Sequence, residues 1–181
     1  MLWLSFTPVI LYLLLETLRK QPQGERRKDR TSTLVLAAAL AWMTLVPTWV
    51  LLSRPTDFSL HPPFFYTGLA TGIAGVWFRA KAMQTLGRFF SRNIGIQNRH
   101  RVVDTGCYRY IRHPGYLGTM GTFVGFALST GSGVVVLANL LCFLTAYSFR
   151  MQMEERALVA HFGSVYSEYQ ARTWKLIPCL Y

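Results

Sequence analysis

Two polar segments of this chain combine side chains that can do acid–base and binding chemistry. The first is Arg88–Gly118, which ends in DTGCYRYIRHPGYLG, a run with two arginines, one histidine and three tyrosines directly before an apolar stretch. The second is Tyr147–Trp174, in which Arg150, Glu154 and Glu155 follow another apolar stretch. Imidazole and carboxylate groups can hold and move protons, and arginines supply a permanent positive charge. We therefore treat these two segments as the candidate site.

The first segment contains a predicted break in the backbone at the edge of the apolar stretch. Pro114 disfavours a helical conformation at His113, so a helix is expected to end or begin here. Irregular backbone at membrane depth is tolerated only where it is buried in protein or lines a cavity. An interfacial belt of aromatic residues with topology-setting arginines explains Arg109 and Tyr110, but it does not explain the His-Pro-Gly sequence.

The second segment places charges close to predicted hydrocarbon. Arg150 and Glu154 are four residues apart and so share one face of a helix. The carboxylates of Glu154 and Glu155 are costly so near a membrane unless cations pair with them, and Arg109 and Arg112 are the expected partners. The plainer alternative is a solvated helix exit that carries an ion pair within the helix.

The elements that would position these residues are predicted to be membrane helices. Apolar residues make up 51% of the 181 residues and charged residues only 15%, against about a quarter charged in soluble domains. Five apolar stretches approach the roughly 20 residues that a span needs: Leu2–Leu18, Thr33–Ser53, Pro63–Ala80, Tyr116–Thr130 and Ser132–Met151. We predict an all-α integral membrane protein with about five transmembrane helices. The alternative is four spans with an interfacial first helix.

The chain is predicted to be a single domain, with three helices in residues 1–80 and the functional half in residues 81–181. Close helix packing is expected where glycines recur at a spacing of four, at Gly68 and Gly72 and at Gly121 and Gly125. After the fifth stretch, apolar residues at helical spacing predict an amphipathic surface helix that Gly163 kinks or breaks.

The positive charges are distributed in a way that predicts topology. Of the 19 lysines and arginines, all but Arg54 lie in residues 19–30, residues 79–112 or the segment from Arg150 onward. With five spans these three regions share one side, which the positive-inside rule makes cytoplasmic. The amino terminus is then outside, and the carboxyl terminus and the site are cytoplasmic. Because topology explains the net charge of +11, and no nucleic-acid-binding motif accompanies it, we expect no nucleic-acid partner.

Several other kinds of site are disfavoured by the sequence. The three cysteines, Cys107, Cys142 and Cys179, contain no C-x-x-C pair, so a disulfide framework or a zinc site is not expected. His113 has no second ligand at metal spacing, and we predict no metal. No glycine-rich loop follows a strand, which argues against a Rossmann-type cofactor site.

The two segments together resemble a known family. GCYRYIRHPGYLG, followed about forty residues later by EERALVAHFGSVYSEYQARTWKLIP, is similar to the isoprenylcysteine carboxyl methyltransferases and to the related phospholipid methyltransferases. The resemblance covers roughly residues 97–178. It implies an integral membrane enzyme that uses S-adenosyl-L-methionine and takes a lipophilic substrate from the bilayer. Cys107 and Trp174 depart from the family pattern, in which proline or another apolar residue is usual at the first position and proline is common at the second.

The resemblance also implies roles for individual residues. The cofactor-binding set would be Gln97, His100, Arg101, Val102, Val103, Tyr108, His113, Pro114, Gly115, Tyr116 and Glu154. Arg150 would bind the substrate carboxylate and, with Glu155 and His113, form the catalytic set. A carboxylate acceptor needs positioning and no base, whereas an amine must lose a proton, for which Glu155 or His113 is the candidate base.

Three functions remain open from the sequence. The first is carboxyl O-methylation of an isoprenylcysteine-type acceptor, and the second is methylation of a phospholipid or of a small hydrophobic amine or thiol. The third is a non-enzymatic membrane protein that retains a degenerate pocket. The sequence does not identify the acceptor, the oligomeric state or the particular membrane.

Overall fold

The computed structural model describes residues 2–18, 30–53, 62–90 and 102–179. The described part is helical, with one isolated bridge between Ile111 and Trp174 and no strand. The helices in chain order are η1 (Leu2–Phe6), α1 (Thr7–Leu18), α2 (Arg30–Ser53), α3 (Pro62–Leu86), η3 (Gly87–Phe89), η4 (Gly106–Arg109), α4 (Pro114–Leu128), α5 (Gly133–Phe162) and α6 (Ser164–Ala171). The prediction of an all-α fold is confirmed for these residues.

The five apolar stretches each correspond to one of the helices α1 to α5, but their lengths differ from the prediction. Two of them, α2 and α5, are long and apolar enough to cross a membrane. At 15 residues, α4 spans only about 22 Å, less than the roughly 30 Å hydrocarbon core of a bilayer. The first part of the expected amphipathic helix is a continuation of α5, which extends to Phe162. Gly163 then ends α5, with φ 58°, and α6 follows.

Glycines bring the backbones of α3 and α4 together, and this contact is the most extensive one between two helices of the described residues. A Cβ atom at Gly118 would lie 2.6 Å from the backbone nitrogen of Arg79, and one at Gly68 would lie 2.6 Å from the carbonyl oxygen of Gly125. No side chain fits at those distances, so the two backbones are in direct contact. Close packing was predicted at Gly68 and Gly72 and at Gly121 and Gly125, and the structure shows that these two helices pack against each other. We call this contact the glycine interface; it comprises Gly68, Gly72, Gly75, Gly118, Gly121 and Gly125.

A side-chain hydrogen bond connects α2 and α5. Pro47 lies inside α2 and has no N–H, so the carbonyl of Met43, four residues earlier, lacks its helical donor. Asn139 of α5 donates through Nδ2 to this carbonyl at 3.2 Å and to the Phe123 carbonyl of α4 at 3.2 Å. Asn139 is fully buried. The proline in α2 is therefore compensated by a neighbouring helix.

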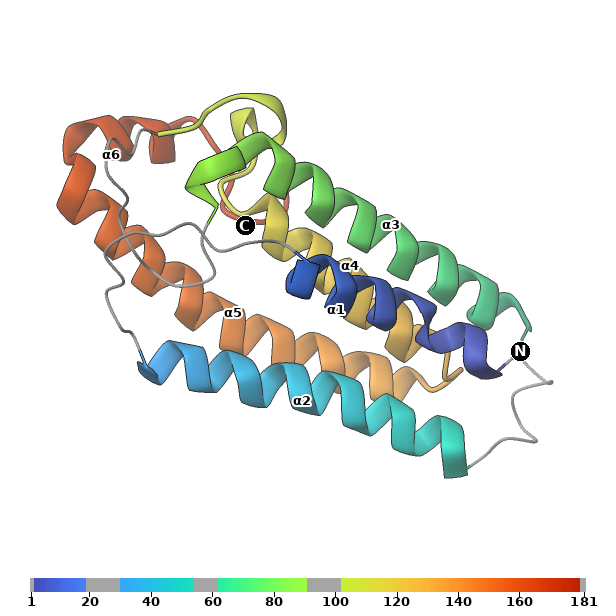
Figure 1. The fold of residues 1–181 in the computed structure, drawn as a ribbon. Coiled ribbons are helices and arrows are strands. Elements are labelled where there is room, and N and C mark those ends of the chain that lie inside the picture. Colours follow the sequence, from blue (N-terminus) through green and yellow to red (C-terminus); the bar gives the residue numbers. More distant parts are fainter. Residues whose placement is uncertain (1, 19–29, 54–61, 91–101, 180–181) are drawn as a thin grey trace.

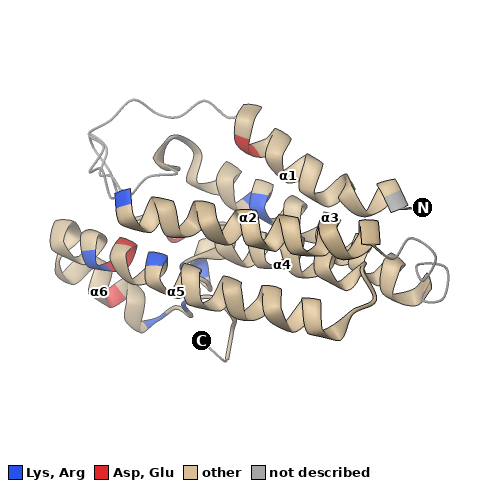
Figure 2. Ribbon diagram, turned by 90° about the horizontal axis from the view of Figure 1, so that it is seen from below, with Lys and Arg blue, Asp and Glu red and all other residues tan. Residues whose placement is uncertain are grey.

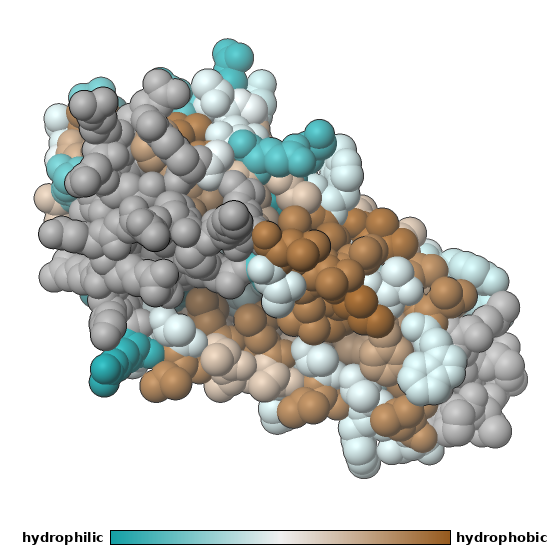
Figure 3. All heavy atoms as spheres, viewed as in Figure 1, coloured by the Kyte–Doolittle hydropathy of each residue, from teal (hydrophilic) through white to brown (hydrophobic). Residues whose placement is uncertain are grey.

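The arrangement leaves polar and apolar surface in different places. In Figure 1, α2 runs beside α5, while α1, α3 and α4 form the other group of helices. Most charged residues of the described part lie toward the end of the bundle that carries α6 (Figure 2). Apolar side chains cover the middle of the face shown in Figure 3. Large apolar residues exposed on the molecule include Ile10, Leu45 and Trp49. Such a surface suits contact with lipid.

Candidate active site

The His113–Pro114 break begins α4. It is held in place by residues 172–179, the segment after α6, which we call the tail. His113 is the residue before the helix, with φ −120° and ψ 54°, and Pro114 occupies the first helical position, where its missing N–H costs nothing. The backbone nitrogens of Arg112 and His113 donate to the carbonyls of Trp174 and Lys175 at 2.8 and 3.1 Å. The expected irregular turn is therefore present, and its backbone is satisfied by residues some sixty positions later.

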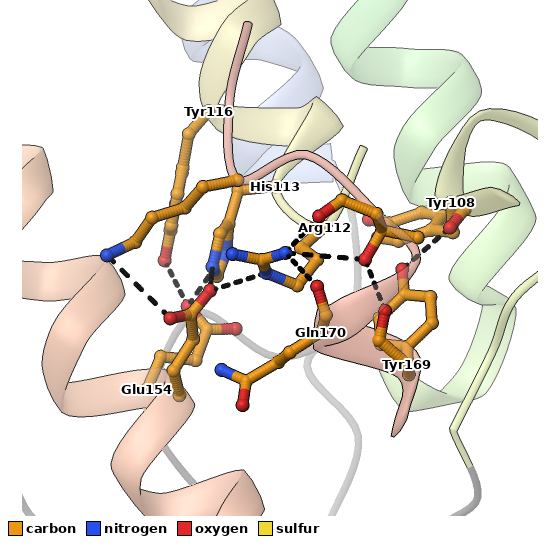
Figure 4. A network of polar contacts seen from close by, with 10 residues as sticks. Tyr108, Arg112, His113, Tyr116, Glu154, Tyr169 and Gln170 are labelled. Carbon is orange, nitrogen blue, oxygen red and sulfur yellow. Dashed lines mark hydrogen bonds and ion pairs between the residues drawn. The ribbon is translucent and has the colours of Figure 1, made fainter. Parts of the chain in front are cut away.

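Two side chains of this turn meet the carboxylates of α5 (Figure 4). The hydroxyl of Tyr116 donates to Glu154 Oε2 at 2.8 Å. The His113 ring stacks on the Tyr116 ring at 5.4 Å between centroids. His113 Nε2 lies 3.1 Å from Glu155 Oε1, and Nδ1 lies 3.9 Å from Glu154 Oε2. We call these four residues the carboxylate cluster, and the buried His113 ring lies between its two acids.

Glu155 is the more heavily paired of the two carboxylates. Arg112 Nε donates to its Oε1 at 2.8 Å, and Lys175 Nζ lies 3.7 Å from its Oε2. Glu155 lies beyond the apolar part of α5. Burial alone would raise its pKa, but hydrogen bonds and charges from His113 and Arg112 outweigh burial and lower the pKa to about 2. It is therefore ionised at neutral pH and holds a proton too weakly to be an effective general base.

Glu154 keeps more of its capacity to bind. Its side chain is 32% exposed, against 12% for Glu155. An ionised carboxylate accepts about four hydrogen bonds, and the Tyr116 hydroxyl supplies one of them. Glu154 is thus suited to receive a cationic or N–H group of a bound molecule.

Arg150 lies one helical turn before Glu154 and is almost completely buried, with 2% of its surface exposed. Its Nη1 donates to the hydroxyl of Ser32 at the start of α2. The Tyr116 hydroxyl interacts with both Arg150 and Glu154. A permanent cation and an accessible carboxylate therefore meet at one phenol.

Tyr108 lies on the other side of the tail. It is buried, and its carbonyl accepts a hydrogen bond from the Tyr169 hydroxyl at 2.7 Å. Burial raises the pKa of the Tyr108 hydroxyl well above its usual range, so this group is a donor at neutral pH. Tyr108 contacts α6 rather than the carboxylate cluster in the hydrogen bonds of the described residues.

The structure gathers some predicted residues and leaves others apart. The residues that it brings together at the junction of α4 and α5 are His113, Pro114, Gly115, Tyr116, Arg150, Glu154 and Glu155. Val102 and Val103 are half-buried, and their place in a cofactor pocket stays a prediction. Gln97, His100 and Arg101 lie outside the described residues. The expected pairing of Arg112 with a carboxylate is confirmed, whereas Arg109 is exposed and lies over the Tyr110 ring at 5.9 Å.

Sequence reasoning missed the contribution of the tail. Arg112 Nη1 donates to the carbonyls of Gln170 and Thr173, so the same guanidinium fixes both Glu155 and the turn after α6. Lys175 adds a second cation at Glu155. The dense positive charge of residues 172–175 was the available signal, but a fold-back over some sixty residues is not readable from local spacing.

The sequence of this chain is similar to those of known methyltransferases. The model of the phospholipid methyltransferase family matches residues 64–165, which runs from α3 through the start of α6 and begins earlier than the motif resemblance. A probable protein-S-isoprenylcysteine O-methyltransferase of rice (Oryza sativa subsp. indica) is 29% identical over 163 residues, covering 86% of this chain and 83% of its own. The human protein-S-isoprenylcysteine O-methyltransferase is 36% identical over 123 residues, covering 62% of this chain and 40% of its own.

The fold is also that of a solved structure. A eukaryotic intramembrane Ras methyltransferase, isoprenylcysteine carboxyl methyltransferase, superposes with a TM-score of 0.62 at 18% identity, covering 97% of this chain and 84% of the other. This likeness extends over α1 and α2, where the sequence has no diagnostic motif.

Proposed function

The chain belongs to the phospholipid methyltransferase family, and from this premise we propose that it is a membrane methyltransferase. The donor is S-adenosyl-L-methionine and the acceptor is a carboxylate on a lipophilic molecule of the isoprenylcysteine type. The observation that carries the proposal is the arrangement on α5 of a buried cation, Arg150, one turn before an accessible carboxylate, Glu154, with Tyr116 between them.

The residues present fit this cofactor. When bound, S-adenosylmethionine supplies a methyl group activated by a sulfonium, together with an ammonium and a carboxylate. Glu154 is negative, part-exposed and only partly satisfied, so it can accept from the ammonium. Burial of its neighbours lowers the local dielectric and strengthens that contact. Of the remaining predicted contacts, Val102, Val103 and Tyr108 lie in the segment that leads into the His113 turn.

Arg150 would bind and orient the acceptor carboxylate. Its guanidinium can hold a carboxylate through two parallel N–H donors, and Ser32 restricts its orientation. A carboxylate already carries the electron pair that forms the new O–C bond, so the protein's task is to hold the two groups in line and about 3–3.5 Å apart. A methyl group supplied by the bound sulfonium would leave the electron pair of its S–C bond on sulfur, so the residues of this chain would not have to move a proton.

His113 and Glu155 are assigned a positioning role in this reaction. Glu155 is clamped by Arg112 and Lys175, and its carboxylate in turn fixes the imidazole of His113. The imidazole then supports the Tyr116 ring by stacking. The hydroxyl of Tyr116 can therefore keep its orientation between Arg150 and Glu154.

The proposed setting is a bilayer with the site on its cytoplasmic side. Most lysines and arginines of the described part lie toward the α6 end of the bundle (Figure 2), and the positive-inside rule assigns such an end to the cytoplasmic face. A polar donor can reach this end from water, while an apolar acceptor can reach it between helices from lipid. Five spans, an outside amino terminus and a cytoplasmic carboxyl terminus complete this proposal.

The test is a radiolabelled methyl-transfer assay on the full chain in detergent or liposomes. A farnesylated cysteine analogue is compared with its methyl ester and with phosphatidylethanolamine. We expect label on the free acid alone, released by mild base because the product is an ester. Label on none of the three, with folding confirmed by circular dichroism, would contradict methyl transfer to these acceptors.

A phospholipid amine is the second candidate, favoured by the description of the matched family. An amine must lose a proton before or during attack, and Glu155, with its pKa near 2, is a poor base for this. His113 would have to serve. Base-stable label on phosphatidylethanolamine, lost in a His113→Gln variant, would select this function over carboxyl methylation.

A further inference from the structure

A second charged contact is buried between α1 and α3, two helices that the proposed mechanism does not use. Arg79 of α3 donates through Nε to Glu16 Oε1 of α1 at 2.7 Å, and its Nη2 lies 2.6 Å from the same oxygen. The side chains are 8% and 16% exposed. Arg79 was expected at a helix boundary as a topology-setting charge. Because α3 continues to Leu86, Arg79 lies within the helix and is buried.

Such a pair is expensive to keep. Ionisable residues within membrane segments are rare and usually functional. Removing two charges from water costs several kcal/mol per ion, which their mutual attraction must offset. Hydrophobic residues would join α1 to α3 at lower cost. A role beyond helix packing is therefore indicated, and the other contacts of Arg79 show where it acts.

Arg79 reaches the first turn of α4. Its Nη1 donates to the carbonyl oxygen of Gly115 at 2.9 Å and to the Thr119 hydroxyl at 2.8 Å, while the Thr119 hydroxyl itself donates to the Gly115 carbonyl at 3.1 Å. Gly115 lies between Pro114 and Tyr116. The guanidinium therefore holds the backbone of the turn from which His113 and Tyr116 extend toward the carboxylates.

Aromatic rings provide a second connection between the two places. The Arg79 guanidinium carbon lies 5.1 Å from the centre of the Tyr12 ring, and Tyr12 hydrogen-bonds with Tyr147. The Tyr147 ring meets the Tyr116 ring edge-on at 5.1 Å. Arg79 is thus connected to Tyr116 by two routes, one through the carbonyl of the neighbouring Gly115 and one through the rings of Tyr12 and Tyr147.

We infer that Glu16 and Arg79 are positioning residues, which hold the His113–Tyr116 turn in register with Glu154 and Arg150. Neither residue touches the proposed ligands. The inference rests on the proposed function and assigns α1 a part in it: Glu16 fixes the guanidinium, and the guanidinium fixes the turn. A displacement of about 1 Å at such a distance from the chemistry can cost up to about 100-fold in rate.

The test uses a mild variant and a stronger one. Thr119→Val removes one partner of Arg79 with little change in volume, and Glu16→Gln keeps the shape of the partner but removes its charge. Binding of S-adenosylhomocysteine by calorimetry, methyl transfer and the midpoint of thermal unfolding are measured for each, per folded molecule. We expect Thr119→Val to weaken cofactor binding about threefold and Glu16→Gln about tenfold, with kcat reduced by similar factors.

Asn139→Leu is the matched control, because Asn139 is also a fully buried polar residue between helices but lies 15 residues, or about 22 Å along α5, from Glu154. A merely structural role predicts that all three variants lower the unfolding midpoint and leave the Kd of folded molecules unchanged. That result would overturn the inference. If Glu16→Gln does not fold, the Kd of Thr119→Val decides alone.

Measurements on the unmodified chain distinguish failure of the proposed function from failure of the positioning role. If it binds no S-adenosylhomocysteine and transfers no methyl group, the proposed function fails. If it is active and Thr119→Val and Glu16→Gln match it in Kd and kcat, only the positioning role fails.

Discussion

The helix α4 takes part in two interfaces that are built in opposite ways. At the glycine interface with α3, the two backbones touch without side chains between them. Toward the end of α5 its first turn presents His113 and Tyr116, which meet Glu154 and Glu155 through hydrogen bonds. The first interface has no adjustable part, while the second keeps a carboxylate that is 32% exposed. Rigid backbone contact fixes the helix so that polar side chains at its start can hold a ligand.

The largest loss of stability is expected when a side chain is introduced into the glycine interface. In a Gly118→Leu variant, the Cβ atom alone would lie 2.6 Å from the backbone nitrogen of Arg79. We expect a loss of about 3 kcal/mol or more in stability, or failure to fold, measured by thermal unfolding in detergent. Gly133→Ala is the control, since nothing lies within 4 Å of its added Cβ. A Gly118→Leu protein as stable as Gly133→Ala would disprove direct backbone contact.

The polar interface predicts the opposite pattern, a loss of activity without loss of fold. Arg150→Lys keeps the charge but loses the planar pair of donors. We expect kcat/KM for a prenylcysteine acid to fall about 100-fold while the Kd of S-adenosylhomocysteine changes less than threefold. Arg156→Lys, at an exposed position later on the same helix, should leave both values unchanged. Equal turnover in the two variants would contradict the carboxylate-binding role.

The sequence predicted the residues of the polar interface better than it predicted the distant contacts that hold them in place. The spacing of Arg150 and Glu154, the Pro114 break and the Arg112 pairing are local or chemical signals, and each is present. The contacts that hold them come from far along the chain: Ser32 at Arg150, Lys175 at Glu155 and Glu16 at Arg79. A lone acid inside the first apolar stretch was a signal that a buried cation exists, but nothing local identified Arg79 as that cation.

The glycine spacing predicted an interface, whereas the α2–α5 contact needed the structure. Pro47 signals a missing donor in α2, but only the folded chain shows that Asn139 compensates at Met43. Asn139→Leu leaves that carbonyl unsatisfied, and we expect a loss of about 1–2 kcal/mol. The unfolding midpoint should fall, while the Kd of S-adenosylhomocysteine per folded molecule stays the same. An unchanged midpoint would show that the hydrogen bond contributes little.

The smallest expected effect concerns the tail. Lys175 is one of three cations or potential cations at Glu155, and Arg112 and His113 remain when it is removed. Lys175→Met should therefore lower kcat/KM less than about fivefold, in line with the modest value of single ion pairs. Arg112→Met removes contacts to both Glu155 and the tail carbonyls, and its effect should be clearly larger. The reverse order would place the main support of Glu155 at Lys175.

The proposed function depends first on Glu154 receiving the cofactor. The most direct measurement is calorimetric titration of S-adenosylhomocysteine into the detergent-solubilised full chain and its Glu154→Gln variant, each with its fold confirmed. We expect saturable binding to the unmodified chain and a Kd at least about 50-fold weaker in the variant, because the amide lacks the negative charge. Equal affinity in the two proteins would contradict it.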